Sequence, residues 1–405
     1  MKYNIWKDYP KMPLPDVLSF IVDNRGKTVP TTENGHILIA TNCVRNENLY
    51  PSYEKIRFLS EETYQTWFRA HPLPGDILFV CKGTPGRCCL VPNPLDFCIA
   101  QDMVALRANQ DIIYNYFLLA VLRSREIQLQ ITNTSVGDVI PHFKKSFFDR
   151  IMIPVPPLDI QKIIGNYYMA FSNKIEINKK INENLEQQAQ VLFKSWFVEY
   201  APFGGVKPKE WVNTNLDNLT SIISRGIAPK YSDGSDQTVI NQKCIRNHMI
   251  DLSLARAHTP KAINEKWLRF GDLLINSTGA GTLGRTAQVW FQPQNLTVDS
   301  HVTIVRPIRE NLIFYIGLWG ILHEREIESL HTGSTGQTEL PRERVKALEL
   351  LLPDNETLDS FNTLIAPIAD AIVSNQEESN RLAALRDVLL PKLMSGELDV
   401  SGIDL

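Results

Sequence analysis

The chain has 405 residues, of which 43% are hydrophobic and 21% charged, and a formal net charge of −3 at pH 7. This composition is typical of a soluble, well-packed protein with room for two or three domains. The N-terminal residues MKYNIWKDYP contain no apolar segment, and the most apolar run, residues 312–322, is too short to span a bilayer. We therefore expect a cytoplasmic protein without a signal peptide or membrane association.

The net charge alone argues against a nucleic-acid-binding protein, but the charges are unevenly distributed. Residues 346–405 carry 4 Lys/Arg against 11 Asp/Glu, whereas residues 1–150 carry 17 against 15. The acidity is thus confined to the last segment. The rest of the chain is compatible with a DNA-facing surface, although the charge does not demonstrate one.

Four stretches of the first half recur in the second half in the same order. They are CVRN (43–46) and CIRN (244–247), PGDILFVCKGTPGR (74–87) and FGDLLINSTGAGTLGR (270–285), MVALR (103–107) and VTIVR (302–306), and IPVPP (153–157) and LLLPD (350–354). Chance does not readily give several matches in one order, so the sequence predicts an internal repeat.

Each repeat is predicted to be mixed α/β. Short apolar runs bounded by Gly, Pro and Asn indicate strands, whereas two longer segments indicate helices. The strands are at 77–80, 103–107, 273–276 and 287–291, and the helices at 111–130 and 310–330. The predicted fold class is α+β, with two similar mixed α/β domains separated by two long helices.

A long helix with heptad periodicity is predicted to close each repeat. The first seam comprises Ile164, Tyr168, Phe171, Ile175, Asn178, Asn182, Leu185, Ala189, Leu192 and Trp196. The second comprises Phe361, Ile365, Ile368, Ile372, Asn375, Ser379, Leu382, Arg386, Leu389 and Leu393. Both have a polar break in the middle, which favours an antiparallel coiled coil between the two helices. The alternative is that each amphipathic helix packs only on its own domain.

Known catalytic motifs are missing. Gly26-Lys27-Thr28 lacks the first glycine of a P-loop, because that position is Ile21, and no HExxH or adenine-methylating motif occurs. The six cysteines form no C-x-x-C pair and no His cluster accompanies them. We expect no catalytic residues, no metal site and no cofactor in this chain, and we expect the cysteines to be buried thiols in a reducing cytoplasm.

The sequence instead favours binding. The turns GTPGR (83–87) and GTLGR (281–285) each offer backbone N–H groups, a hydroxyl and a guanidinium, which suit contacts to phosphates or guanine edges. The alternative is a tight turn whose arginine is merely solvated. The candidate DNA-binding residues are Arg25, Lys27, Arg45, Lys82, Thr84, Arg87, Thr134, Ser135, Arg225, Lys230, Arg246, Ser277, Thr278, Thr282, Arg285, Ser334, Thr335 and Gln337.

Three stretches resemble the specificity (S) subunits of type I restriction–modification systems. They are IPVPPLDIQKII (153–164), LFKSWFVEYAPF (192–203) and LRDVLLPKLMSGEL (385–398), placed around two variable segments. The resemblance covers nearly the whole chain. It implies target recognition domains at 1–156 and 201–353, spacer helices at 157–200 and 354–396, and a C-terminal tail at 397–405.

The resemblance also implies partners. Each domain would read one half of a bipartite sequence in double-stranded DNA. Two methyltransferase (M) subunits with S-adenosylmethionine, and restriction (R) subunits with ATP and Mg, would join this non-catalytic subunit. The alternatives are an orphan or anti-restriction S-like protein, a fused enzyme of type IIG, whose methylase and nuclease motifs are missing, and a coiled-coil scaffold that binds partners other than DNA.

Overall fold

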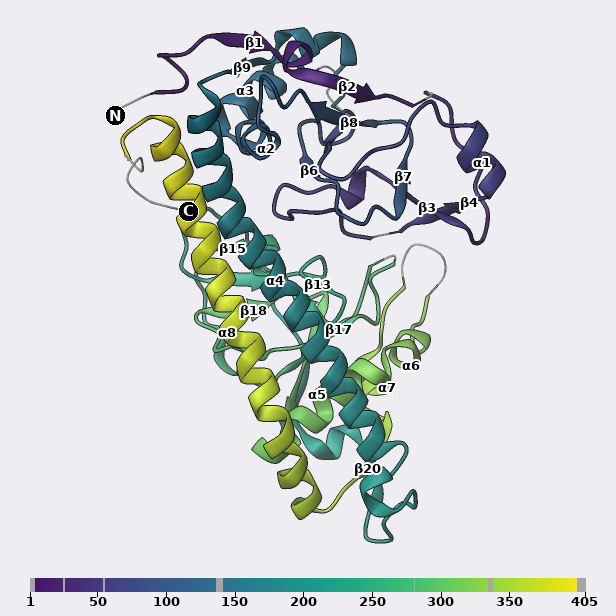
Figure 1. The fold of residues 1–405 in the computed structure, drawn as a ribbon. Coiled ribbons are helices and arrows are strands. Elements are labelled where there is room, and N and C mark those ends of the chain that lie inside the picture. The colour runs from purple at the N-terminus through teal and green to yellow at the C-terminus, as the bar shows by residue number, and fades with distance from the viewer. Residues whose placement is uncertain are drawn as a thin grey trace. The chain divides into compact units, whose positions relative to one another are not determined.

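The computed structural model describes residues 4–24, 26–53, 55–135, 141–279, 281–333 and 338–398 (Figure 1). The chain forms two compact units: unit 1 comprises residues 1–179 and 377–405, and unit 2 comprises residues 180–376. Each unit contains part of both long helices, α4 (Leu158–Phe197) and α8 (Asn355–Met394). The N-terminal segment belongs with the end of α8 in unit 1, because the Ile5 N–H donates to the Met394 carbonyl.

Unit 1 is mixed α/β. Its strands are β1 (Lys11–Pro13), β2 (Leu18–Val22), β3 (His36–Ile39), β4 (Arg57–Leu59), β5 (Ile77–Val80), β6 (Cys88–Leu90), β7 (Phe97–Ile99), β8 (Met103–Ala108) and β9 (Met152–Pro154). Its other helices are α1 (Glu61–Thr66), α2 (Asn115–Arg123) and α3 (Arg125–Thr134). The strands form a four-stranded sheet β2-β8-β5-β6, a three-stranded sheet β4-β3-β7 and the pair β1-β9.

Strand β5 shows why these runs form buried strands. All four of its residues are buried, and they alternate between two cores. Ile77 and Phe79 pack with α2, whereas Leu78 and Val80 pack with β3 and β7. An uninterrupted apolar run is the pattern expected of a strand covered on both faces.

Unit 2 repeats this architecture. Its strands are β10 (Val212–Asn215), β11 (Thr220–Arg225), β12 (Thr238–Ile240), β13 (Ile245–Arg246), β14 (Met249–Ile250), β15 (Arg256–Ala257), β16 (Leu273–Asn276), β17 (Thr286–Gln288), β18 (Leu296–Val298), β19 (Val302–Pro307) and β20 (Glu349–Leu352). Its other helices are α5 (Ile313–Leu322), α6 (Glu324–Ser329) and α7 (Arg342–Lys346).

The sheet orders β11-β19-β16-β17, β15-β12-β18 and β10-β20 match those of unit 1 strand for strand. The first sheet even has its register shift at the same place in both units, between Leu18 and Phe20 and between Thr220 and Ile222. The predicted fold class, two similar mixed α/β domains with long helices, is therefore confirmed. Unit 2 adds the hairpin β13-β14.

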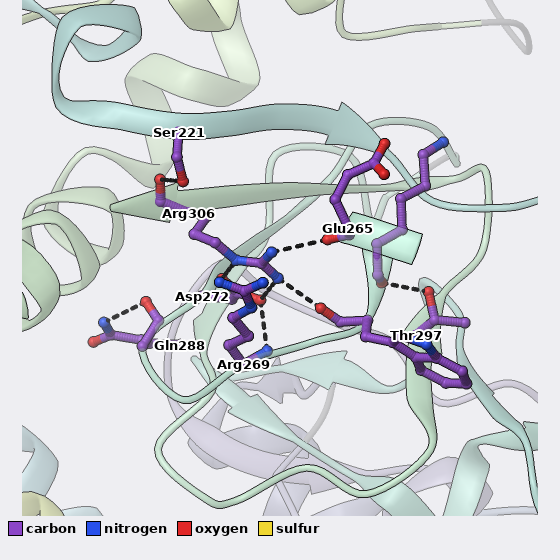
Figure 2. A network of polar contacts seen from close by, with 10 residues as sticks. Ser221, Glu265, Arg269, Asp272, Gln288, Thr297 and Arg306 are labelled. Carbon is purple, nitrogen blue, oxygen red and sulfur yellow. Dashed lines mark hydrogen bonds and ion pairs between the residues drawn. The ribbon is translucent and has the colours of Figure 1, made fainter. Parts of the chain in front are cut away.

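The repeated Gly-Asp and the arginine of the MVALR and VTIVR runs form one structural device. Asp272 accepts from Arg306 Nε at 2.8 Å and from Nη2 at 2.7 Å (Figure 2), and Asp76 accepts from the same two atoms of Arg107 at 3.0 and 2.9 Å. The preceding glycine is at a positive φ, +89° for Gly271, where other residues are strained. The ion pair thus links the start of the third strand of the sheet to the end of its neighbour in each unit.

The two long helices pair antiparallel within each unit, since higher residue numbers on α4 meet lower ones on α8 (Figure 1). In unit 1, Asn178 Nδ2 donates to Ser379 Oγ at 3.3 Å and to Glu378 Oε2 at 2.7 Å. In unit 2, Asn375 Nδ2 donates to Asn182 Oδ1 at 2.9 Å. The polar breaks of the two seams therefore face each other, as buried polar layers that fix helix register do.

The helices also pack on the units, so the alternative that each helix packs only on its own domain is wrong, although packing on the domain occurs beside the helix pairing. The seam residues Ile164, Asn178, Ile365 and Ile372 are buried, whereas Phe171, Ile175, Leu185, Leu192, Trp196, Ile368, Asn375, Leu382 and Leu389 are half-buried. A second face carries Phe193 and Phe197, which are buried in the core of unit 2 against Tyr315 of α5. The heptad seam is therefore only one of the two packed faces.

Candidate nucleic-acid interface

The turn between β5 and β6 is closed by backbone hydrogen bonds. The N–H of Val80 donates to the Arg87 carbonyl at 2.9 Å, and the N–H of Gly86 donates to the Val80 carbonyl at 3.0 Å. Unit 2 has the same two bonds. The N–H of Asn276 donates to the Arg285 carbonyl at 2.9 Å, and the N–H of Gly284 donates to the Asn276 carbonyl at 2.8 Å. The two arginines therefore occupy equivalent positions on equivalent turns.

The glycine of each turn is required by its position. Gly284 has a φ of +82°, and a Cβ there would lie 2.7 Å from the Glu328 Cα on α6. The turn is thus pressed against the following helix, and no larger residue fits. Unit 2 inserts two residues, 280 and 281, between Gly279 and Thr282, so that Gly83 corresponds to Gly279 rather than to Gly281.

A second loop of each unit, which contains His142 in unit 1 and Glu339 in unit 2, lies beside the turn. Lys82 forms an isolated bridge with His142, and Thr278 forms one with Glu339. Arg225, the last residue of β11, joins this group through its ion pair with Glu339 at 2.7 Å and donates to the Leu340 carbonyl at 3.1 Å. The structure therefore brings the turn, the second loop and Arg225 together within unit 2.

Several candidate side chains are at least partly exposed to solvent. Lys27, Lys82, Thr84 and Lys230 are exposed, and Arg45, Arg87, Arg246, Thr278 and Arg285 are half-buried. Lys27 and Lys230 lie on loops that follow β2 and β11. One nitrogen of the Arg285 guanidinium is bound within the turn, because Nη2 donates to the Gly281 carbonyl at 2.8 Å.

Other candidates serve the fold. Ser277 is fully buried and its hydroxyl bonds Thr303 Oγ1 at 2.5 Å, so the expectation that it faces DNA is wrong. Thr282 donates to the carbonyls of Thr278 and Gly279. Thr134 and Ser135 donate to carbonyls of α3, at Gln130 and Ile131. Arg25, Ser334, Thr335 and Gln337 lie outside the described residues.

Two residues at the unit 2 turn were not predicted from the sequence, His301 and Gln242. His301 Nδ1 lies 2.7 Å from Thr278 Oγ1, and the same hydroxyl donates to Gln242 Oε1 at 3.3 Å. His301 stands directly before VTIVR, as Asp102 stands before MVALR. Alignment of those two repeats, extended by one residue, would have pointed to it.

The cysteines play no part in this surface. All six are buried thiols, as the sequence indicated. Burial raises the pKa of Cys81 to about 12 and that of Cys244 to about 11, which keeps them protonated and unreactive. No helix in the described part of the chain is long and apolar enough to cross a membrane.

A separate cluster of ionisable side chains in unit 2 comprises Glu186 of α4, His248 and Glu324. Glu324 Oε2 accepts from the Thr286 N–H at 2.8 Å and lies 3.4 Å from His248 Nδ1. The hydrogen bond to Glu324 raises the pKa of His248. Burial raises the pKa of the neighbouring Glu186 to about 7, although the charge of His248 acts to lower it. Glu186 lines a narrow cavity of about 30 Å³, which is large enough to hold water.

We expect Glu186→Gln to stabilise unit 2 at pH 8 but not at pH 5. The folded-state pKa of Glu186 lies above its unfolded value, so its protonated form favours folding, and that contribution is lost as the pH rises through about 7. Glutamine resembles the protonated acid. The gain at pH 8 should be on the order of 1–3 kcal/mol in denaturant unfolding.

The exposed Glu210→Gln serves as the control, because it should change stability little at either pH. An equal effect of Glu186→Gln at both pH values would mean that the carboxyl is solvated.

Comparison with known proteins shows which family the first part of the chain resembles. The family described as Type I restriction modification DNA specificity domain matches residues 8–187. The resemblance to type I specificity subunits seen in the sequence is thereby confirmed by this match over the first part of the chain.

Particular relatives extend the match to most of the chain. The specificity subunit of the type I restriction enzyme MjaIX from Methanocaldococcus jannaschii is 26% identical over 80% of this chain and 78% of that protein. The HindI specificity subunit of Haemophilus influenzae is 22% identical over 80% of this chain and 86% of that protein. The crystal structure of an S subunit from M. genitalium has a TM-score of 0.54 at 13% identity, covering 97% of this chain and 98% of that one, and supports the fold alone.

Proposed function

We propose that this chain is the DNA sequence-recognition subunit of a type I restriction–modification complex, and that each unit reads one half of a bipartite target. One observation carries the proposal: the two units repeat the same sheets and the same exposed turn, yet present different side chains around it. Two copies of one scaffold with different surfaces suit a ligand with two different halves. The recognition domains are assigned to 1–156 and 201–353.

The chain contributes recognition and no chemistry of its own in this proposal. M subunits, expected to number two, bring S-adenosylmethionine and methylate adenine, and R subunits bring ATP and Mg. Phosphate contacts supply much of the affinity of DNA-binding proteins. The partners would supply part of that charge, in keeping with the net charge of −3 of this chain.

The helices α4 and α8 are assigned a spacer role, over residues 157–200 and 354–396. Each is 40 residues long, which corresponds to roughly 60 Å of helix. Their pairing through matched polar layers favours one fixed register, and a fixed register gives a fixed distance between half-sites.

The proposal is tested by mapping methylated adenines in the native host with and without this gene. Loss of one split motif, two short half-sites around a constant gap, is the expected result. An unchanged map would favour the orphan or anti-restriction alternative. A coiled-coil scaffold without DNA contacts would further show no salt-dependent affinity for duplex DNA.

Replacing Arg87 or Arg285 with alanine should weaken recognition of one half-site and leave the other intact. A bidentate contact from arginine to guanine contributes about 1–3 kcal/mol of base discrimination. The measurement is the affinity of the purified chain, with its M subunits, for duplexes altered in either half-site. Equal loss on every sequence would indicate a phosphate contact, and no loss would mean that the arginine is only solvated.

A further inference from the structure

The repeat identifies positions that share a backbone but differ in side chain. The N–H of Cys81 donates to the Asp102 carbonyl at 2.8 Å, and the N–H of Ser277 donates to the His301 carbonyl at 2.8 Å. Lys82 and Thr278 are likewise equivalent, because each forms the bridge to the second loop of its unit. Unit 1 thus carries Lys and Asp where unit 2 carries Thr and His.

The side chains of unit 2 are linked into a defined arrangement. Thr278 Oγ1 donates its proton to Gln242 Oε1, so it accepts from Nδ1–H of His301. The backbone of Gln242 is held in place, because its main-chain carbonyl accepts from Asn276 Nδ2 at 3.0 Å. In the neutral form of an imidazole, a proton on Nδ1 leaves the lone pair on Nε2. His301 is exposed, and Nε2 has no hydrogen-bond partner among the residues that the structure describes.

The imidazole is not needed to shape the loop. The backbone of His301 is already held on both sides, by its carbonyl bond to Ser277 and by the bond from its N–H to Asp299 Oδ1 at 2.9 Å. Asp102 occupies the same place in unit 1 with the same carbonyl bond and no imidazole. What the ring adds is an oriented hydrogen-bond acceptor next to the Arg285 turn.

We propose that His301, oriented by Thr278, is a base-specificity residue of unit 2, and that Lys82 and Asp102 take its place in unit 1. The inference rests on the proposed function. An outward Nε2 acceptor suits an amino group in the major groove, which is N6 of adenine or N4 of cytosine. Lysine instead donates to O6 and N7 of guanine, and a carboxylate accepts from N4 of cytosine. The two half-sites would therefore differ at this contact.

The test is the methylated-adenine map of the native host carrying single substitutions in this gene. His301→Ala should relax one base position in one half-site, so that other bases there are methylated within a few-fold of the original instead of being rejected roughly tenfold or more. The other half-site and the gap stay unchanged. Lys82→Ala should alter only the opposite half-site.

A pair of substitutions at Thr278 keeps the test decisive if His301→Ala abolishes methylation. Thr278→Val keeps the shape but removes the hydroxyl that orients the ring, so it should relax the same base position, whereas Thr278→Ser should retain the specificity. The exposed Lys209→Ala serves as the control and should leave the whole motif unchanged.

The outcomes separate this inference from the proposed function. A wild-type map without any split motif would refute the proposed function. A wild-type split motif that keeps every base in the His301→Ala and Thr278→Val variants would refute the role of His301 alone. The double substitution Thr278→Lys with His301→Asp adds a positive result, because it should change the preferred base at that position rather than relax it.

Discussion

Replacing Arg306 with alanine should lower the free energy of unfolding of unit 2 by about 3–5 kcal/mol, the usual cost of removing one partner of a buried ion pair. The side chains of Arg306 and Asp272 are only 7% and 1% exposed. Arg306 also donates to the carbonyls of Glu265 at 2.8 Å and Trp267 at 2.6 Å (Figure 2). Its removal leaves a buried carboxylate and two carbonyls without this donor.

The equivalent substitution in unit 1 provides a matched control. Arg107 makes the same two bonds to Asp76, but its side chain is 28% exposed, so water can replace part of the interaction. Arg107→Ala should therefore cost only about 1–2 kcal/mol. Hydrogen exchange of the β16 and β19 amides, compared with those of β5 and β8, reports the two units separately. Equal losses in both units would show that burial does not determine the cost.

A double substitution examines the source of the penalty. Burial raises the pKa of Asp272 even though Arg306 acts to lower it, so the attraction to Arg306 does not fully offset the desolvation of the carboxylate. Asp272→Leu combined with Arg306→Met should consequently be more stable than Arg306→Ala alone. If the double variant were the less stable one, the ion pair itself would be the larger contribution.

The sequence predicted the scaffold because both copies repeat the residues that build it. The strands at 77–80 and 273–276 are the observed β5 and β16. The aspartate of each Gly-Asp pair forms an ion pair with the arginine that ends the MVALR or VTIVR run of the same unit. The sequence predicted the ends of helices and strands less reliably than their presence. The helix expected over 111–130 is interrupted at Ser124, whose hydroxyl accepts from the Ile127 N–H and starts α3. The strand expected over 287–291 ends at Gln288.

The candidate site was harder to predict because it depends on residues brought together by folding. Gln242, Thr278 and His301 are linked by hydrogen bonds but lie on three separate loops. Ser277 and Thr278 are neighbours in the sequence, yet Ser277 is fully buried directly after β16, whereas Thr278 is half-buried and bonds to Gln242 and His301. Because all four residues of β16 are buried, the strand has no alternation of buried and exposed residues from which the first exposed position could be predicted.

Lengthening both spacer helices should change the gap of the recognised sequence without changing its half-sites. Four residues add roughly 6 Å of helix, or about two base pairs. The insertions belong after Lys180 in α4 and after Gln376 in α8. These points separate the Asn178–Ser379 contact from the Asn182–Asn375 contact, so each unit keeps its own polar layer. A four-residue insertion also perturbs a heptad seam only locally.

The measurement is again the methylated-adenine map, with the original motif replaced by one whose gap is wider by about two base pairs. A matched control inserts the same four residues between Gly204 and Gly205, an exposed loop with positive φ at both glycines, and should leave the gap unchanged. Methylation that persisted at the original gap after insertion into both helices would exclude α4 and α8 as the spacer. An insertion into α4 alone should reduce methylation more than insertion into both helices, since it shifts one seam relative to the other and separates the facing polar residues.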